Sequence, residues 1–338
     1  MRLEDYDYDL PSELIAQTPI EPRDNGRLLD CLSQTNCFYD RKVSELPELL
    51  DSGDLVVVND SKVIPARLFL NKRTGAEIEI LLLRRSDGEY GPNSWEALIR
   101  PLKRCPNGTE LYSKDEKLIA FVQDRIHGSD GGDVGVVTFC EGHNPLDLGS
   151  IALPPYISNP DINNERYQTI FAAHPGSIAA PTAGLHFTEG LVEGLRSKGI
   201  EIAKVNLEIG LDTFRPISVD DPAKHQIHSE YYCIPDETLH KCEQASRVVA
   251  VGTTTVRALE SCYATGKLYG STNLYIYGKY QFKVVDVLMT NFHLPRSTLL
   301  LMIEAFCGPI WKDIYRHAIT NRYRMLSFGD AMIVARES

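Results

Sequence analysis

Residues 66–150 carry the pattern of short strands alone, and this constrains the fold more than any other feature of the chain. Apolar stretches such as AEIEILLLRR at 76–85 and DVGVVTFC at 133–140 alternate with turn sequences such as SDGEYGPN at 86–93. No amphipathic helix pattern interrupts them. We therefore expect a small antiparallel β-barrel, inserted into a second domain.

The flanking parts of the chain alternate strands with helices. The apolar strand DLVVV at 54–58 ends in a polar loop, a strand at 248–251 leads into a helix, and ERYQTIFAA at 165–173 has the composition of a short helix. This alternation predicts the α/β class, with a mainly parallel sheet and helices on both faces. The predicted domains are a discontinuous α/β catalytic domain, 1–65 and 151–338, and an inserted β-barrel domain, 66–150.

Five polar loops lie where predicted strands end or helices begin. Ligands of open α/β sheets bind outside the carboxyl ends of the strands. Convergence of the loops in one cleft is the main argument from the residues that the chain is an enzyme. The loops are 59–67, 176–188, 210–216, 252–257 and 290–297.

The loop GSIAAPTAGLHFT at 176–188 is rich in small residues and contains one histidine, His186. Small residues let backbone N–H groups approach a ligand closely. A helix is expected to begin after Thr188, and a helix N-terminus favours an anion or a polar ligand. The alternative is a surface turn with a buried histidine.

Gly252 and the threonines 253–255 join a strand to a helix, a geometry that suits an anion, a carboxylate or a ribose hydroxyl. The alternative is simple capping of the helix by one threonine. HQIHSEYY at 225–232 brings His225, His228 and Glu230 together, but a metal site needs further ligands from elsewhere. We expect a polar binding loop there, or the start of a strand, and no metal.

The formal net charge of −11 argues against a general nucleic-acid-binding surface, yet the charge is uneven. Residues 1–60 hold 5 Lys/Arg and 14 Asp/Glu, whereas 66–104 hold 8 and 5, and 311–324 hold 4 and 1. These basic islands either hold a polyanion locally or are ordinary solvated faces. No apolar run is long enough to cross a bilayer, and the acidic start is unlike a signal peptide, so we expect a cytoplasmic protein with no membrane partner.

Several common catalytic signals are absent from the sequence. It contains no Walker A, GxSxG, GxGxxG or HExxH motif, and its eight cysteines include no CxxC pair. The polar loops instead offer hydroxyls, amides, histidines and arginines. Such groups suit general acid–base chemistry on a polar substrate that carries a carboxylate or a phosphate.

The sequence resembles the S-adenosylmethionine:tRNA ribosyltransferase-isomerase family of the queuosine pathway. Glu208 and Ile209 stand where that family has a His-Val pair, and Asp212 replaces a glycine. The resembling segments span the chain: YDYDLPSELIAQTPIEPRDNGRLL at 6–29, DLVVVNDSKVIPARL at 54–68, WEALIRPLKR at 95–104, LPPYI at 153–157, ERYQTIFA at 165–172, GSIAAPTAGLHFT at 176–188, GLDTFRPI at 210–217, HQIHSEYY at 225–232, VVAVGTTTVRALES at 248–261, FKVVDVLMTNFHLPRSTLL at 282–300 and LSFGDAM at 326–332.

The resemblance implies that the ribosyl part of S-adenosylmethionine is transferred to 7-aminomethyl-7-deazaguanine at the wobble position of tRNA. Rearrangement to an epoxycyclopentane gives epoxyqueuosine and releases adenine and methionine. The implied partners are S-adenosylmethionine, as co-substrate without a permanently bound cofactor, and tRNAs with a GUN anticodon (Tyr, His, Asp, Asn). The family fold is an α/β domain with an inserted β-barrel, and we expect a monomer or a weak oligomer.

The reaction needs a base for the C5′ proton that the sulfonium acidifies, and a proton donor for the departing adenine. His186 is the first candidate, because the unperturbed pKa of histidine lies near neutrality; His228 and His293 are the second. Asp60 or Glu208 is assigned to the sulfonium charge.

The resemblance also places substrate contacts in the shared loops. Thr253, Thr254, Thr255 and Arg257 are assigned to the methionine carboxylate or the ribose hydroxyls. The target base must leave its stack to be reached, and basic side chains supply salt-dependent affinity for phosphates. The other predicted substrate residues are Asn59, Ser177, Pro181, Thr182, Asp212, Arg215 and Asn291, and the predicted tRNA-binding residues are Arg67, Arg100, Lys103 and Arg104.

Three other functions are distinguishable by their products. An S-adenosylmethionine-dependent RNA methyltransferase would release S-adenosylhomocysteine and no adenine. A non-catalytic RNA-binding module would release nothing. A hydrolase of small nucleosides would need no RNA.

Overall fold

The chain divides into two compact units, Met1–Lys62 with Pro154–Ser338, and Val63–Leu153. The predicted insert, 66–150, falls within the second unit. Among the described residues, no helix is long and apolar enough to cross a membrane. The structure, a computed structural model, describes residues 2–32, 37–86, 88–127, 133–159, 162–210, 217, 219–227 and 229–337.

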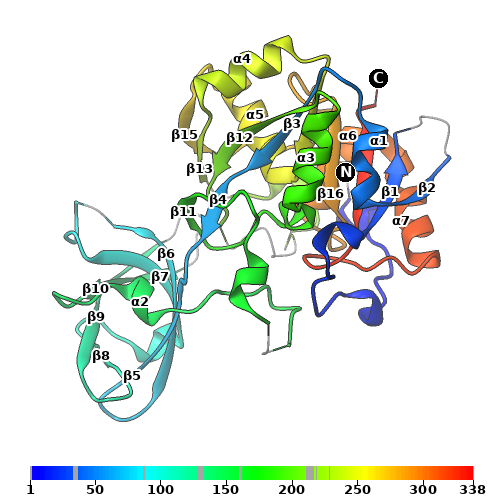
Figure 1. The fold of residues 1–338 in the computed structure, drawn as a ribbon. Coiled ribbons are helices and arrows are strands. Elements are labelled where there is room, and N and C mark those ends of the chain that lie inside the picture. Colours follow the sequence, from blue (N-terminus) through cyan, green and yellow to red (C-terminus); the bar gives the residue numbers. More distant parts are fainter. Residues whose placement is uncertain are drawn as a thin grey trace. The chain divides into compact units, whose positions relative to one another are not determined.

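The second unit is a closed barrel of antiparallel strands (Figure 1), as the strand-and-turn pattern predicts. Buried and more exposed residues alternate along its strands; in β6, for example, Ile78, Ile80 and Leu82 are buried. This two-residue period places one set of side chains inside the barrel. In barrel order the strands are β10 (Asp133–Phe139), β7 (Ser94–Arg100), β6 (Glu77–Arg85), β5 (Arg67–Asn71), β8 (Glu110–Tyr112) and β9 (Leu118–His127), and the short helix α2 (Pro145–Leu148) follows β10.

The first unit is built on a nine-stranded sheet whose central strands β12, β3, β14 and β16 run parallel. Antiparallel pairings occur between β16 and β17 and at both edges, so the sheet is mixed. The connection from β1 to β2 is too short for a crossover helix and makes that edge antiparallel. In sheet order the strands are β15 (Tyr269–Thr272), β13 (Glu230–Cys233), β12 (Glu201–Leu207), β3 (Asp54–Asn59), β14 (Arg247–Val251), β16 (Val287–Asn291), β17 (Ala331–Ala335), β1 (Arg27–Cys31) and β2 (Tyr39–Lys42).

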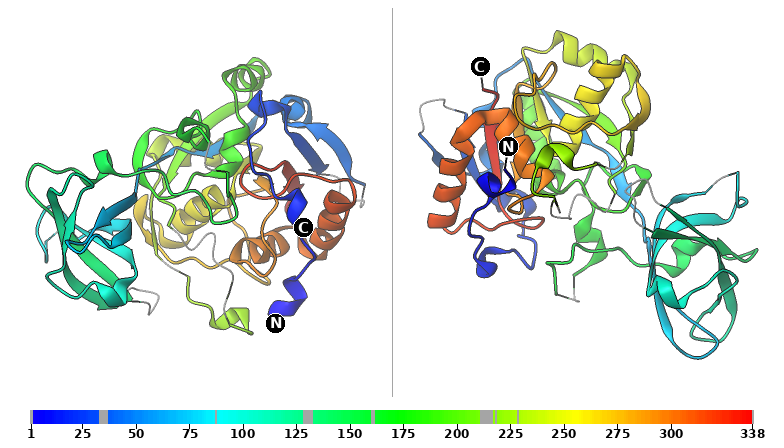
Figure 2. Two further views of the ribbon diagram at one scale, coloured as in Figure 1. Left: turned by 90° about the horizontal axis from the view of Figure 1, so that it is seen from below. Right: turned by 180° about the vertical axis from the view of Figure 1, so that it is seen from behind.

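Helices cover both faces of this sheet, which confirms the predicted α/β class. Leu55 and Val57 of β3 belong to one core with α5, α6 and α7, whereas Val56 and Val58 belong to a second core with α1 and α3. Figure 1 shows α1 and α3 on the nearer face, and Figure 2 shows the yellow and orange helices from behind. The helices are α1 (Leu46–Leu49), α3 (Glu189–Ser197), α4 (Asp236–Gln244), α5 (Thr253–Thr265), α6 (Thr298–Cys307) and α7 (Trp311–Thr320).

The local predictions had mixed outcomes. Thr188 is the N-cap of α3, since its Oγ1 accepts the N–H of Leu191 at 3.1 Å, as expected. The predicted helix over 165–173 is wrong, because only the 3₁₀ turn Asn164–Tyr167 forms there. The Oγ1 atom of Thr169 accepts the N–H of Phe171 at 3.2 Å, a local bond that competes with helical pairing.

Glu260 ties α5 to the segment that leads into β16. The carboxylate is fully buried and accepts backbone N–H groups of Lys283, Val284 and Val285, with shortest distances of 3.0, 2.9 and 3.2 Å. Buried carboxylates need such partners, and the bonds hold the two elements together. Because α5 begins at Thr253 and β16 ends at Asn291, the bond network also positions the site described next.

Candidate active site

A pocket, here called the central pocket, lies at the carboxyl ends of β14 and β16, where α5 and α6 begin. Parallel pairing of the two strands brings these ends to one edge of the sheet. Six predicted site residues line it: Pro181, Thr182, Thr253, Thr254, Asn291 and His293. Its other lining residues include Tyr156, Ala180, Ile209, Gly252, Thr290, Ser297, Leu299, Leu326 and Ser327.

Gly252 lines the central pocket directly before the N-terminus of α5. Its φ of 90° lies in the left-handed region that favours glycine, and it serves as the N-cap without help from a threonine side chain. The hydroxyls of Thr253 and Thr254 are therefore not needed for capping. Across the pocket, Thr182 Oγ1 donates to Asn291 Oδ1 at 3.0 Å, which fixes the orientation of that amide.

Three predicted contact residues lie behind the pocket wall. Asn59 bonds to backbone groups of Leu207 through Nδ2 at 3.0 Å and Oδ1 at 3.1 Å. Ser177 Oγ accepts the N–H of Ile209 at 2.8 Å, and Thr255 Oγ1 donates to the carbonyl of Val251 at 2.8 Å. All three are buried and brace the elements that form the wall.

The two described histidine candidates occupy different pockets. His293 lines the central pocket with its Nε2 atom 3.0 Å from Thr290 Oγ1. His186, at the end of the 3₁₀ turn Thr182–His186, lies in a neighbouring pocket with its Nε2 atom 3.3 Å from Asn291 Nδ2. His228 lies outside the described residues, as do Asp212 and Arg215.

Both histidines are neutral at pH 7. Burial lowers the pKa of His293 to about 3. Burial, and then the charge of Arg324, lowers the pKa of His186 to about 4. The expectation of a pKa near neutrality for His186 is therefore wrong: the buried imidazole is a proton acceptor at pH 7, with no proton to donate as an imidazolium.

Asp60 and Glu208 occupy the same edge of the sheet. Asp60 is buried, with Oδ2 3.1 Å from His174 Nδ1 and Oδ1 accepting from Asn206 Nδ2 at 3.1 Å. Glu208 is half-buried, and burial raises the pKa of its carboxyl group. A Cβ atom at Gly176 would lie 2.7 Å from Glu208 Oε1, so the glycine makes room for this carboxylate.

A second pocket, here called the Arg257–Glu230 pocket, adjoins the central pocket, because Leu299 lines both. Arg257 Nη1 donates to Glu230, and Nε donates to the carbonyl of Leu274 at 3.2 Å. Among the described residues, neither Arg257 Nη2 nor the hydroxyl of Tyr275 has a hydrogen-bond partner. The remaining walls are mostly apolar, with Ile227, Ile276 and Met302.

A third pocket, here called the arginine pocket, was missed by the sequence predictions. Arg23, Arg166 and Arg324 line it together with His186, and Ser327 lines both this pocket and the central one. A signal was present in the sequence. Arg23 and Arg166 lie in segments that carry the family resemblance, 6–29 and 165–172, and Arg324 lies two residues before a third, 326–332.

The predicted tRNA-binding residues belong to the barrel unit. Arg100, Lys103 and Arg104 are exposed, whereas Arg67 is partly exposed and its Nε donates to Glu79 Oε1 at 2.8 Å. In the part of the chain that the structure describes, no group of three or more His, Cys, Asp or Glu side chains is arranged to hold a metal ion.

Known proteins are similar to this chain in sequence from end to end. S-adenosylmethionine:tRNA ribosyltransferase-isomerase of Thermotoga maritima is 46% identical over 99% of this chain and 100% of its own length. The proteins of the same name from Clostridioides difficile and Thermus thermophilus are 44% and 46% identical, with at least 98% of this chain covered.

A solved structure agrees with this relationship. The crystal structure of S-adenosylmethionine tRNA ribosyltransferase from Thermotoga maritima matches 98% of this chain and 99% of that chain, with 38% identity and a TM-score of 0.56. A family model described as "Queuosine biosynthesis protein" matches residues 3–334. From these matches across its whole length, the chain belongs to the queuosine biosynthesis protein family and is a transferase of the S-adenosylmethionine:tRNA ribosyltransferase-isomerase type.

Proposed function

We propose that the protein transfers and isomerises the ribosyl moiety of S-adenosylmethionine onto 7-aminomethyl-7-deazaguanine at the wobble position of tRNA. The products are epoxyqueuosine in the tRNA, adenine and methionine. End-to-end similarity to relatives that bear the ribosyltransferase-isomerase name carries this proposal. The tRNA partners are those with a GUN anticodon, and the enzyme acts in the cytoplasm as a monomer or weak oligomer.

S-adenosylmethionine occupies the central pocket in this proposal. The hydroxyls of Thr253 and Thr254 line the pocket at the start of α5, where each can donate to a ribose oxygen, although Thr254 Oγ1 also accepts from Asn59 Nδ2 at 3.3 Å; the N-terminus of α5 favours a polar ligand. The Asn291 amide and His293 line the same space. Asp60 or Glu208 faces the sulfonium, whose positive charge a carboxylate stabilises.

The methionine end of the substrate extends past Leu299 into the Arg257–Glu230 pocket. An α-amino acid carries one carboxylate and one ammonium group. Arg257 Nη2 is an unpaired donor for the carboxylate, and the neighbouring Glu230 carboxylate is an acceptor for the ammonium. The paired charges of the protein therefore complement a zwitterion without adding net charge to a buried site.

The chemistry requires four coupled events. The sulfonium acidifies the C5′ proton, and a base that removes it leaves a carbanion stabilised by sulfur. Adenine leaves from C1′ with a proton, and the amine of the modified base attacks C1′ and loses a proton. Rearrangement to the epoxycyclopentane then breaks the C5′–S bond, and methionine leaves as the neutral thioether. Neutral His186 is our first candidate for the proton acceptor, with His293 and His228 as alternatives. Barrel residues Arg67, Arg100, Lys103 and Arg104 contribute phosphate contacts.

Adenine release tests the proposed reaction. Purified protein is mixed with S-adenosylmethionine and an anticodon stem-loop that carries either guanine or 7-aminomethyl-7-deazaguanine at the wobble position. We expect adenine and methionine only with the modified base, together with a matching mass gain on the RNA. S-adenosylhomocysteine as the product would mean methyl transfer. No product from folded protein that binds both substrates would contradict the proposal.

The zwitterion site is tested by removing the carboxylate from the ligand. Wild-type protein is expected to bind S-adenosylmethionine about tenfold or more tightly than decarboxylated S-adenosylmethionine, because a charge-assisted hydrogen bond to arginine is lost. In the double variant Arg257→Met/Glu230→Gln, which removes both buried charges together, this preference should vanish. Isothermal titration calorimetry measures both affinities.

The matched control for the zwitterion site is a double variant of the exposed ion pair on α7, Arg316→Met/Asp313→Asn. It should keep the wild-type preference, because its charges are exposed and do not line either substrate pocket. Equal affinities of the wild-type protein for the two ligands would exclude the carboxylate site.

A further inference from the structure

The arginine pocket concentrates positive charge that the protein itself leaves largely unpaired. Among the described residues, Arg23 donates only to carbonyl oxygens, those of Gln168 at 2.7 Å, Glu165 at 3.4 Å and Leu185 at 3.5 Å. Carbonyl oxygens are hydrogen-bond acceptors without a formal charge, so the guanidinium charge of Arg23 is not neutralised by them.

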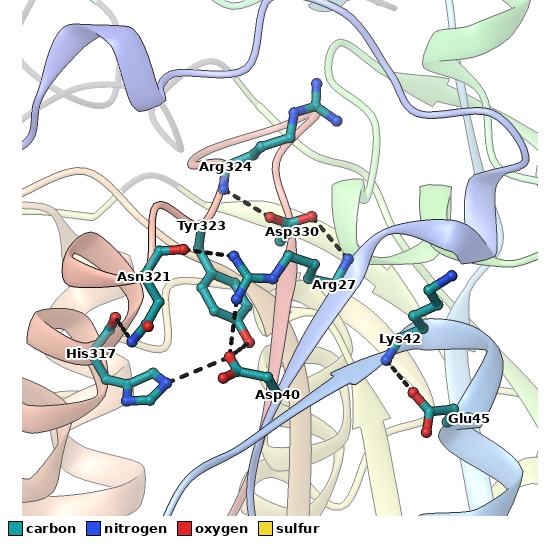
Figure 3. Close-up of polar contacts among 9 residues, drawn as sticks. All are labelled: Arg27, Asp40, Lys42, Glu45, His317, Asn321, Tyr323, Arg324 and Asp330. Carbon is teal, nitrogen blue, oxygen red and sulfur yellow. Dashed lines mark hydrogen bonds and ion pairs between the residues drawn. The ribbon is translucent and has the colours of Figure 1, made fainter.

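Arg324 is in the same position. Its Nη2 donates to the carbonyl of Thr18, and its Nη1 is buried without a hydrogen-bond partner among the described residues. The nearby Asp330 carboxylate is occupied by backbone N–H groups, of Arg27 at 2.9 Å and of Arg324 itself at 2.8 Å. Figure 3 shows the guanidinium of Arg324 pointing away from Asp330 and from the Arg27–Asp40 contacts.

Arg166 has the only carboxylate partner of the three among the described contacts. Its Nε lies 2.5 Å from Glu21 Oε1, and the Glu21 side chain is 67% exposed. Among the described residues, only Arg166 of the three guanidinium groups forms an ion pair with a carboxylate, and Asp330 offsets the charge of Arg324 without accepting a hydrogen bond from its guanidinium. Burial and then the charge of Arg166 lower the pKa of Arg23 against the opposing charge of Glu21, and burial lowers the pKa of Arg324 against the opposing charge of Asp330, so the nearby carboxylates only partly offset the burial of these cations.

We propose that the arginine pocket binds a phosphodiester group of the RNA substrate, directly beside the nucleotide that reacts in the central pocket. The inference rests on the proposed function only in taking RNA as the substrate. Planar guanidinium groups match phosphate oxygens in pairs, and arginine is the preferred residue for such recognition. Ser327 and the Asn291–His186 hydrogen bond connect the two pockets, which places the anion next to the reaction centre.

A phosphate in this position also acts on His186. The charge of Arg324 is one of the two causes of the low pKa of His186, so an anion that offsets this charge makes the imidazole more basic. RNA binding would then strengthen the proton acceptor only when the substrate nucleotide is in place. The net charge of −11 gives the chain little general attraction for RNA, which makes such a local contact valuable.

The test removes one phosphate charge at a time from the RNA. Anticodon stem-loops with a single methylphosphonate linkage are titrated into wild-type protein, and binding is followed by fluorescence anisotropy without S-adenosylmethionine. We expect one linkage that flanks the wobble nucleotide to weaken binding about tenfold or more, as for loss of a charge-assisted hydrogen bond. Because the wild-type protein is used, folding of a variant does not enter this step.

The protein side uses Arg324→Met and Arg23→Met. Each should bind the unmodified stem-loop more weakly and lose its sensitivity to that one linkage, whereas the control Arg196→Met, which removes an exposed arginine in the last turn of α3, should behave as wild type. Thermal unfolding verifies that each variant is folded. An equal, small loss at every linkage overturns the proposal, as does a linkage effect of unchanged size in Arg324→Met.

Two other sources of an anion give different results. If Arg324→Met raises the KM for S-adenosylmethionine and leaves RNA binding unchanged, the pocket serves the methionine carboxylate and the proposal is wrong. If inorganic phosphate binds to the protein but no methylphosphonate linkage weakens RNA binding, the pocket binds free anions only, and the proposal is wrong. If one methylphosphonate linkage weakens RNA binding but the enzyme releases no adenine, the phosphate site is supported and the proposed reaction is contradicted. The two proposals can therefore fail separately.

Discussion

The His186→Ala variant is expected to release adenine from S-adenosylmethionine about 10²- to 10⁴-fold more slowly than the wild-type enzyme, the usual range for loss of a general acid–base group. His186 is buried, neutral at pH 7 and 3.3 Å from the Asn291 amide that lines the central pocket. It also lies among the arginines proposed to hold the RNA phosphate. Single-turnover adenine release with saturating RNA measures the chemical step apart from product release.

The competing candidate and a neutral control are tested in the same assay. His293→Ala removes the histidine that lines the central pocket itself, and a larger rate loss there than in His186→Ala would transfer the role to His293. His240→Ala, on the exposed side of α4, should leave the rate unchanged. A His186→Ala variant that is folded and reacts within a few-fold of the wild-type rate would exclude His186 from proton transfer.

The wild-type protein should lose stability steeply as the pH falls from 7 to 5. The unfolded chain takes up protons on His186 and His293 below their ordinary pKa of 6.5, whereas the folded protein takes them up only near about 4 and about 3. The unfolded state therefore binds more protons in this interval, and each histidine lowers the free energy of unfolding by about 2 kcal/mol at pH 5. Urea unfolding at a series of pH values measures this loss.

A double variant isolates the histidines from the carboxyl groups that titrate in the same range. His186→Asn/His293→Asn should flatten the stability profile between pH 7 and 5, even if it is less stable at pH 7. Glu208 acts in the opposite direction, because its raised pKa lets the folded protein bind a proton more readily than the unfolded chain. Parallel profiles for the wild type and the double variant would show that neither imidazole is held neutral by burial.

Sequence pattern and local interactions predicted much of the fold. The short apolar stretches at 66–150, separated by turn sequences and uninterrupted by any helical pattern, predicted a small antiparallel barrel, which the structure has. Thr188 predicted the start of α3, since a threonine N-cap is a local interaction. The helix predicted over 165–173 did not form, and there too a local interaction competes: the backbone N–H of Phe171 donates to the Thr169 side chain, which helix propensity does not report.

For the candidate site, too, the position of some residues could be predicted from the sequence, whereas their protonation state could not. Residues at the ends of β14 and β16 were found from the sequence, because the carboxyl edge of a parallel sheet gathers the loops that follow its strands. The protonation state of His186 could not be predicted in this way. Its pKa was expected near neutrality, whereas burial and the charge of Arg324 lower it to about 4. The effect of burial on the pKa depends on all the atoms around the imidazole ring, so a local sequence pattern cannot predict it.

The sequence by itself determined the α/β class, the inserted barrel, the family and three of the polar loops, 176–188, 252–257 and 290–297, that meet in the central pocket. These follow from periodicity and from residue types that act over a few positions. Only the tertiary structure decided that Arg23, Arg166 and Arg324 share one pocket with His186. They lie far apart in the chain, and the excess charge that they form depends on which oxygens each guanidinium meets after folding. This charge is the combined effect of side chains that are distant in the sequence, and folding alone brings them together.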